Sequence, residues 1–535
     1  MKPETREKLI FLAVCLGLVL LIYGQTIFGD FVFDDRGIVE HQFLLSDLKN
    51  FHRILTYPYW TEEVGLYRPV TLISYGLNFA VLGKDPAGFH FVNLILYAIS
   101  GFLIFLLVKK LFFNKILAYL SSFLFLVLPI HTEVVSNIIG RAEILALFFS
   151  LLVFWELSRE KINFWRPGLW FLLAMGSKET AIAALPIILF LIYFKEKKFF
   201  KKEILARYFS GAIAVFVGGI IYFLARFFVL GRQYFLGVET TIVENPLKFA
   251  PFLPRIITAF KVLTIYLKKS FWPFGLCSDY SYNQIPVLDN FFNWETILGA
   301  AVFLFLIAGV FIFLKRAPIL SFGSALFVFG FLPVSNLLFP TGTIAGERLV
   351  YFSSLGLCLW LAAILFFISK IKPQKFFQWL FLFSAISLVV FYAAMSYWRS
   401  NDWLTEKRLF ISASRCAPDS VLSRSNLGAI YYLEGNLGEA KKELLQAQKI
   451  YDGYPKGVNN LGLVYWKEGN KEKARELFLR ALSLRFPYYG AYENLALMAL
   501  EEGNLEEAKK WLLEFYSGNE EMTEFYINSY RFQKR

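Results

Sequence analysis

The strongest constraint on the fold of this chain is a succession of long apolar runs. The first run covers residues 9–28, and a helix needs about 20 predominantly apolar residues to cross the hydrocarbon core of a bilayer. Hydrophobic residues make up 57% of the 535-residue chain, whereas a soluble domain is typically about 45–50% apolar. The pattern therefore predicts an integral membrane protein with an all-α, polytopic membrane domain.

Ten more apolar runs follow, and several of them are short. A further run, residues 249–267, contains two prolines together with Arg255 and Lys261. We therefore expect it to form an interfacial or re-entrant helix inside a long outer loop over residues 231–293. About eleven transmembrane helices are expected in total. The ten additional runs are residues 91–108, 116–130, 144–157, 165–175, 181–194, 208–230, 294–314, 319–339, 349–368 and 376–397.

Lys and Arg residues gather in short clusters between the apolar runs and do not form one basic face. The net charge of +13 therefore indicates membrane topology and no nucleic-acid partner, because positive residues are enriched in cytoplasmic loops. The clusters mark alternate ends of the runs, on the side of Lys2, Arg6 and Lys8. This predicts a cytoplasmic N-terminus and, after eleven spans, a C-terminal region on the opposite side. The clusters are Lys109, Lys110 and Lys115; Arg159, Lys161 and Arg166; residues 195–202; Lys315 and Arg316; and Lys370, Lys372 and Lys375.

After residue 397 the apolar runs stop and a repeat with a 34-residue period begins. Such a period, with small residues where paired helices touch, is typical of tetratricopeptide repeats. The recurring patterns are Asn-Leu-Gly or Asn-Leu-Ala at 426–428, 460–462 and 494–496, Glu-Gly-Asn at 434–436, 468–470 and 502–504, and Ala440, Ala474 and Ala508. We expect a membrane domain over residues 1–398, a junction over 399–420, three repeats forming an α-solenoid over 421–522 and a C-terminal tail over 523–535.

Charged residues also gather at the ends of the spans where topology requires no positive charge. The neighbouring carboxylates Asp34 and Asp35 follow directly on the first span, and charges at a membrane boundary are costly unless they are solvated, paired or used. Cations and carboxylates at one depth suit an anionic phosphate together with an acid–base group. The other members of this set are Arg68, His131, Glu133, Arg141, Glu143, Lys178, Glu179, Asp279, Tyr280, Glu347 and Arg348.

Each of these residues also has a simpler interpretation. The two aspartates are compatible with an ordinary solvated loop that contains an Asx turn, and the others with helix caps or span ends. His131 is either a hydrogen-bonded structural residue or, with Glu133 and the two aspartates, a ligand for a hard divalent cation. The sequence has no glycine-rich phosphate loop, no Gly-x-Ser-x-Gly elbow and no His-Glu-x-x-His motif, so hydrolase and zinc-protease functions have no support.

Taken in order, these motifs resemble those of the transmembrane and tetratricopeptide-repeat protein family, in a prokaryotic form. The resemblance covers essentially the whole chain. It is carried by Phe33-Asp34-Asp35, Tyr67-Arg68-Pro69, Phe-His-Phe-Val-Asn at 89–93, His131-Thr132-Glu133, Gly-Arg-Ala-Glu at 140–143, Lys178-Glu179, Ser-Asp-Tyr-Ser at 278–281, and Gly-Glu-Arg-Leu-Val-Tyr at 346–351.

The resemblance implies a C-type glycosyltransferase fold with an active site on the non-cytoplasmic face. Animal members of the family are similar to protein O-mannosyltransferases and use dolichyl-phosphate mannose. A polyprenyl-phosphate-linked sugar is therefore the implied donor, and a hydroxyl group of Ser or Thr in a polypeptide is the implied acceptor. The catalytic acidic residue of the first outer loop, residues 29–90, falls on Asp35 or Asp34. The setting would be a bacterial inner membrane with periplasmic repeats.

The roles of the remaining residues are expected from their charge and from the side of the membrane on which they are predicted to lie. We expect Arg141, Lys178 and Arg348 to hold the departing phosphate, and Glu133 and Glu143 to orient these cations or to bind sugar hydroxyls. The donor site is expected to include His131, Glu179 and Glu347 as well, and Arg68, Asp279 and Tyr280 to support the loops. A divalent cation is the one cofactor left open. The alternative function is a non-catalytic membrane scaffold whose repeats bind a partner protein.

Overall fold

The computed structural model describes residues 3–60, 65–196, 202–234, 240–371 and 375–533. Within these ranges the regular secondary structure is helical and contains no strand, so the all-α fold is confirmed. The chain divides into two compact units. The first consists of residues 1–240, 247–278 and 287–409, and the second of residues 241–246, 279–286 and 410–535.

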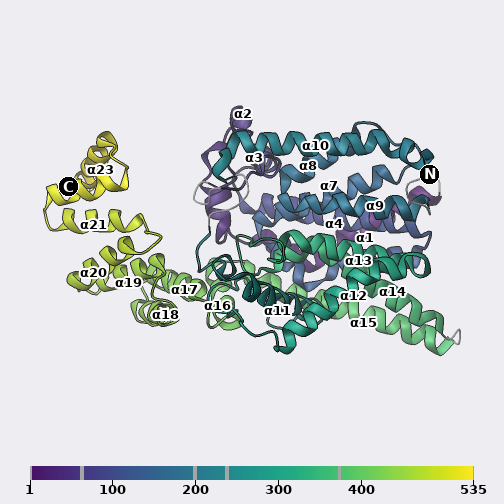
Figure 1. The fold of residues 1–535 in the computed structure, drawn as a ribbon. Helices are drawn as coiled ribbons and strands as arrows, with labels where there is room; N and C mark the ends of the chain where they lie inside the picture. The colour runs from purple at the N-terminus through teal and green to yellow at the C-terminus, as the bar shows by residue number, and fades with distance from the viewer. Residues whose placement is uncertain (1–2, 61–64, 197–201, 235–239, 372–374, 534–535) are drawn as a thin grey trace. The chain divides into compact units, whose positions relative to one another are not determined.

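The first unit is a bundle of long apolar helices that run roughly side by side (Figure 1). Among the described residues, seven helical stretches are long and apolar enough to cross a membrane, which identifies a multi-pass membrane protein. The helices that supply them are α1 (Pro3–Tyr23), α4 (Pro86–Phe112), α7 (Arg141–Leu157), α10 (Lys202–Tyr234), α12 (Trp294–Arg316), α14 (Tyr351–Ile371) and α15 (Lys375–Ser400).

Four shorter helices account for the other predicted spans. Helix α5 (Lys115–Val127) and the segment Pro129–Ser136, which includes α6 (Thr132–Ser136), form a bent pair with a 50° break that would count as an eighth span. Helices α8 (Arg166–Ser177), α9 (Ala184–Glu196) and α13 (Pro318–Phe331) have 12, 13 and 14 residues, which is short for a bilayer. Every predicted run thus coincides with a helix, but the number of eleven spans is not confirmed.

The run predicted to be interfacial forms helix α11 (Phe252–Phe271), which is absent from the spans found among the described residues. It contains Arg255, Lys261, Lys268 and Lys269, and its apolar face is buried. It packs closely on α12: the hydroxyl of Thr264 donates to the carbonyl of Glu295 at 2.6 Å. A Cβ at Gly299 would lie 2.0 Å from the carbonyl oxygen of Phe260, so this contact requires glycine.

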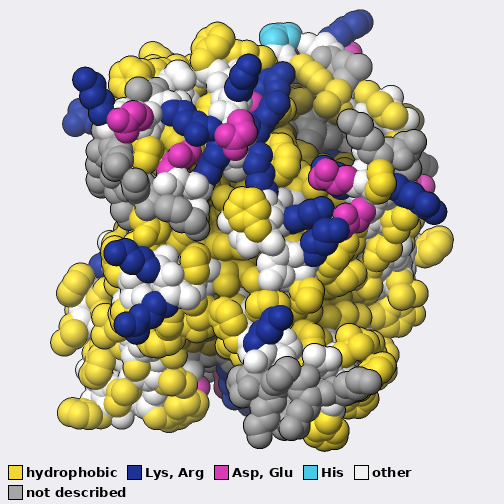
Figure 2. Space-filling view, turned by 90° about the vertical axis from the view of Figure 1, so that its right-hand side faces the viewer, with side chains coloured by type: hydrophobic (Ala, Val, Ile, Leu, Met, Phe, Trp, Pro, Cys, Tyr) yellow, Lys and Arg dark blue, Asp and Glu magenta, His cyan; other side chains and the backbone are white. Residues whose placement is uncertain are grey.

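Different side chains and segments cover the two ends of the helix bundle. At the end where the N-terminus lies in Figure 1, Lys and Arg side chains gather over the helix ends (Figure 2). The opposite end carries short helices of the first loop, among them α2 (Phe51–Ile54) and α3 (Pro69–Leu82), over a core that includes Phe31, Tyr75 and Phe89. The hydroxyl of Thr71 in α3 donates to the carbonyl of Ser177 in α8 at 2.9 Å. This loop-covered end positions the charged motifs.

The second unit contains three helix pairs and a final helix. In each pair a glycine with positive φ (Gly435 at 79°, Gly469 at 86° and Gly503 at 77°) ends the first helix. The asparagine that follows caps the second helix with its side chain. This explains the recurring Glu-Gly-Asn pattern, because the turn needs a left-handed residue and the helix needs a cap. The helices are α17 (Val421–Leu433), α18 (Leu437–Ile450), α19 (Pro455–Lys467), α20 (Lys471–Ser483), α21 (Gly490–Glu501), α22 (Leu505–Phe515) and α23 (Glu520–Gln533).

Two short stretches of the predicted outer loop, residues 241–246 and 279–286, belong to this second unit. The Tyr282 N–H donates to the carbonyl of Val243 at 2.8 Å, and the Tyr282 carbonyl accepts from the N–H of Val421, the first residue of α17, at 2.8 Å. Loop residues thus complete the start of the repeat array. At its other end, Ile527 of α23 is buried against α21 and α22, so the predicted tail is a capping helix.

Candidate functional site

Asp35 is a fully buried carboxyl at the loop-covered end of the first unit. Its Oδ1 accepts the backbone N–H of Ile139 at 2.9 Å, and its Oδ2 accepts the backbone N–H of Val32 at 3.3 Å. Burial raises the pKa of this carboxyl to about 8, because desolvation outweighs the two hydrogen bonds, and the charge of Asp34 acts in the same direction. Asp35 therefore holds the first loop against the segment that leads into α7.

Asp34 lies beside it in a different environment. Its side chain is partly exposed, and it is close enough to Arg348 for their charges to interact. The residue before it, Phe33, has a φ of 52°, a left-handed conformation that a bulky side chain rarely adopts and that costs of order 1–3 kcal/mol. Such strain persists only where the surroundings enforce it, and it lies directly beside Asp34.

Arg348 is held by Glu133 of α6. One carboxylate oxygen of Glu133 accepts the backbone N–H of Arg348 at 2.9 Å, and the other accepts its Nη1 at 2.8 Å. The Glu133 side chain is only 2% exposed, whereas the Arg348 side chain is 29% exposed. Among the described residues, the Nη1 contact with Glu133 uses one of the five N–H donors of the Arg348 guanidinium group, and the other donors have the chemistry to bind an anion.

A second ion pair, between Lys178 and Glu143, lies in the same charged group. Both side chains are less than 10% exposed, and the Lys178 ammonium donates to Glu143. Burial lowers the pKa of Lys178, Glu143 offsets part of this effect, and the charges of Arg68 and Arg348 lower it further. Glu143 also interacts electrostatically with Arg348. Asp34, Glu133, Glu143, Lys178 and Arg348 thus form one electrostatically connected group, called here the charged cluster.

Glu179 connects two arginines next to this cluster. Its carboxylate accepts Nε of Arg68 at 3.1 Å and Nη1 of Arg226 at 3.0 Å, and Arg226 also donates to the carbonyl of Gly65 at 2.7 Å. Although burial opposes ionisation, the two arginines lower the pKa of Glu179 below its usual value. Arg226 was missed in the sequence. The available signal was an arginine inside the apolar run 208–230, because an ionisable residue in a span is costly unless it has a partner.

Arg141 is fully buried, and its guanidinium group is held by contacts inside the protein. It donates from Nε to Asn93 Oδ1 at 2.7 Å, and from Nη2 to Asn78 Oδ1 at 3.0 Å and the carbonyl of Phe89 at 2.8 Å. Nη1 donates to the carbonyl of Ser74 at 3.2 Å, and the guanidinium lies over the Tyr75 ring. Every nitrogen of Arg141 is thus engaged, and the residue ties α3 and α4 to the start of α7.

His131 is a buried, hydrogen-bonded residue, in line with its structural interpretation. Its Nδ1 lies 2.9 Å from the Tyr97 hydroxyl and 3.0 Å from the carbonyl oxygen of Phe125, and its Nε2 lies 2.6 Å from the Ser354 hydroxyl. Within the described ranges, no group of three or more His, Cys, Asp or Glu side chains is arranged to hold a metal ion.

The three remaining candidates lie outside the charged cluster. Glu347 is buried and accepts the backbone N–H of Cys277. Asp279 and Tyr280 belong to the second unit. There Asp279 accepts the hydroxyls of Ser281 at 3.0 Å and Ser423 at 2.7 Å, and that of Ser420 as well. Asp279 therefore anchors residues 279–286 to the start of α17.

Comparison with known proteins confirms the resemblance that the motifs indicated. Residues 69–222 match the family model described as dolichyl-phosphate-mannose-protein mannosyltransferase, and residues 459–520 match that of the tetratricopeptide repeat. The first match begins at Pro69 and ends within α10. It therefore includes Glu133, Glu143 and Lys178 but not Asp34 or Arg348.

Several curated proteins are similar to this chain over most of its length. The chain is 28% identical to protein O-mannosyl-transferase F38B6.6 of Caenorhabditis elegans over 83% of its own length and 63% of the relative. It is 27% identical to protein O-mannosyl-transferase TMTC3 of Mus musculus (81% and 50%) and 28% identical to TMTC4 of Mus musculus (79% and 64%). The chain thus spans about half to two thirds of these relatives. All three are animal proteins and lend no support to the expected prokaryotic form.

Proposed function

We propose that this protein is a membrane glycosyltransferase that moves mannose, or a similar hexose, from a polyprenyl-phosphate carrier to a Ser or Thr hydroxyl of a polypeptide. The observation that carries the proposal is the charged cluster, in which a partly exposed carboxylate, Asp34, lies close to a partly exposed guanidinium, Arg348. A base and a phosphate-binding cation must lie close together when a hydroxyl displaces a phosphate from one carbon. The match over residues 69–222 supports the same chemistry.

Asp34 is the better candidate for the base, and Asp35 for a positioning residue. In the proposed step the acceptor oxygen forms a bond to the anomeric carbon, the bond from that carbon to the phosphate oxygen breaks, and the hydroxyl proton passes to Asp34. The direct displacement inverts the configuration at this carbon. Asp35 is fully buried and both of its oxygens are occupied by backbone N–H groups, so it supports the loop that presents Asp34.

The leaving phosphate needs cations with free donors. Arg348 retains N–H donors beyond the one bound by Glu133, and the Lys178 ammonium has three N–H groups, one of which is given to Glu143. The acidic partners Glu143 and Glu133 favour the charged forms of Lys178 and Arg348. Every nitrogen of the Arg141 guanidinium group already donates a hydrogen bond. We therefore assign Arg141 to positioning α3 and α4.

The basic end of the bundle (Figure 2) is proposed to face the cytoplasm. The charged cluster then lies on the non-cytoplasmic side, which would be the periplasm in the bacterial inner membrane expected from the sequence. The repeats would hold the polypeptide acceptor, since stacked helix pairs form extended surfaces that bind peptides.

The test is intact-glycopeptide mass spectrometry on cells that produce the wild-type chain or the Asp34→Asn variant at equal levels. Loss of a hexose from Ser or Thr of defined proteins in the variant is the expected result, and it names the acceptors. An unchanged glycoproteome, combined with loss of function only when the repeats are altered, would contradict the proposal and favour the membrane-scaffold function.

A further inference from the structure

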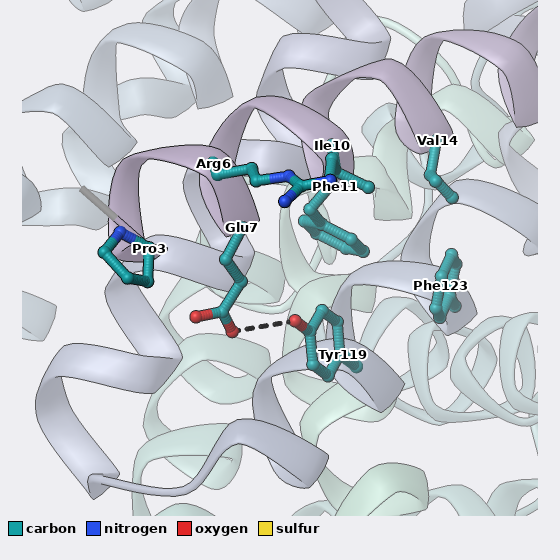
Figure 3. A pocket seen from close by; sticks show the side chains of 8 residues that line it. All are labelled: Pro3, Arg6, Glu7, Ile10, Phe11, Val14, Tyr119 and Phe123. Carbon is teal, nitrogen blue, oxygen red and sulfur yellow. Dashed lines mark hydrogen bonds between the residues drawn. The ribbon is translucent and has the colours of Figure 1, made fainter. Parts of the chain in front are cut away.

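A groove on the surface of the first unit lies between α1 and α5. It has a volume of about 780 Å³ and is lined by Pro3, Arg6, Glu7, Ile10, Phe11, Val14, Tyr119 and Phe123. Figure 3 shows these side chains arranged along α1, with the two aromatic rings of α5 facing it. Neither the proposed reaction nor the repeat array uses this groove.

The floor of the groove is aromatic and its rim is apolar. Phe11 is only 4% exposed and packs edge-on against the rings of Tyr119 and Phe123, with ring centroids 4.9 and 5.4 Å away. Ile10 and Val14 remain 54% and 43% exposed. From Pro3 to Val14 the helix rises about 16 Å, at ~1.5 Å per residue, close to half of the ~30 Å hydrocarbon thickness of a bilayer. The groove therefore matches one leaflet in length and in polarity.

The charges lie at one end of the groove. Glu7 is already bound, because it accepts the Tyr119 hydroxyl at 2.9 Å and the Lys115 ammonium at 3.0 Å, with Lys109 at 3.4 Å. Arg6 is exposed, and no carboxylate of the described residues lies within ion-pair distance of it. In Figure 3 its side chain extends along α1 toward Ile10 and Phe11. The cations Arg6, Lys109 and Lys115 outnumber the carboxylate of Glu7, so these four residues have a net positive charge. Arg6, which has no carboxylate partner among the described residues, lies at the rim of the groove.

We infer that this groove binds an anionic phospholipid of the leaflet at the basic end of the bundle. The phosphate binds to Arg6, and one acyl chain lies over Phe11 and Phe123 between the two helices. An amphiphile with one anionic end fits because the groove has one available cation at one end and apolar walls elsewhere. A second helix would need apolar side chains along its whole length and would leave Arg6 without an anion.

Native mass spectrometry of the full chain in mild detergent tests this, with phosphatidylglycerol and phosphatidylcholine of the same acyl chains as probes. Wild type is expected to retain phosphatidylglycerol preferentially. Arg6→Gln should weaken its binding about fivefold, the effect of one basic residue near an anionic lipid, and abolish the preference, whereas Arg6→Lys should keep it. Val14→Trp, which fills the groove, should weaken both lipids. The matched control is Lys8→Gln, which removes the same charge from the same helix at a residue paired with Glu4 at 3.0 Å.

Three results would overturn the inference, provided that each variant keeps the wild-type melting temperature. An equal loss of phosphatidylglycerol binding in Arg6→Gln and Lys8→Gln would show a diffuse effect of charge and no specific site. Unchanged binding in Val14→Trp would show that no acyl chain occupies the groove. A dimer of the chain that Val14→Trp dissociates would show that a second copy covers this surface.

Discussion

Asp35 and Ile139 lie 104 residues apart in the sequence and are joined by a 2.9 Å hydrogen bond from the Ile139 N–H to Oδ1 of Asp35. The bond connects the loop after α1 to the short turn that opens α7. Because Oδ2 accepts the Val32 N–H of the same loop, one carboxyl group fixes both sides of the backbone that presents Asp34. The two neighbouring aspartates therefore lie in different environments, although they are adjacent in the sequence.

This difference predicts opposite phenotypes for the two aspartates. Asp34→Asn should lower transfer about 10²–10⁴-fold, the usual effect of losing a general base, with little change in melting temperature because Asp34 is partly exposed. Asp35→Ala should cost about 1–3 kcal/mol of stability, because two backbone N–H groups lose their acceptor. Transfer rates and melting temperatures of the purified variants in detergent measure both effects. Equal destabilisation by the two changes would contradict the assignment.

The buried carboxyl also predicts a pH dependence of stability. The pKa of Asp35 is about 8 in the folded chain and about 3.9 when unfolded. The folded state therefore retains a proton that the unfolded state loses, so this contribution to stability is full below pH ~4 and falls as the pH rises toward 8. These two pKa values set the useful range at about pH 5 to about pH 8. Over this range the melting temperature of wild type should fall more steeply with rising pH than that of Asp35→Asn. Parallel curves would rule out a protonated Asp35.

The pair of Lys178 and Glu143 predicts strong coupling. Both side chains are less than 10% exposed, so Lys178→Met or Glu143→Leu alone leaves one charge buried without its partner, at a cost of about 3–5 kcal/mol. The double variant should lose less stability than the sum of the two single variants. Denaturation midpoints of the three variants and wild type give the coupling energy, and strictly additive losses would show that the pair is not a unit.

Arg141 and Arg348 provide a matched comparison of two arginines. Arg348→Lys should raise the KM for the lipid-linked donor, because a planar group with several donors is replaced by a point charge. Arg141→Lys should lower the melting temperature, since four hydrogen bonds to α3 and α4 depend on the guanidinium shape, and it should leave the KM of the folded protein unchanged. The reverse pattern would place the phosphate at Arg141.

Local patterns were sufficient to predict the helices and the repeats. Apolar length predicts where helices of the bundle lie, and the 34-residue period predicts the paired helices of the repeats. The contacts of the charged residues could not be predicted in this way. Glu133 and Arg348 are 215 residues apart, and Arg141 differs from Arg348 through acceptors that it meets only in the folded chain, among them Asn78 and Asn93. Arg226 was missed because its run is otherwise apolar.

In the proposed function, Asp34 and Arg348 carry out sugar transfer from a lipid phosphate. The most direct measurement uses the purified full chain in liposomes, a polyprenyl-phosphate-linked radiolabelled mannose and a Ser/Thr-containing peptide. We expect label in the peptide with wild type, and almost none with Asp34→Asn of equal melting temperature. Equal transfer by wild type and Asp34→Asn, or no transfer by a folded wild-type chain from this donor to this acceptor, would contradict it.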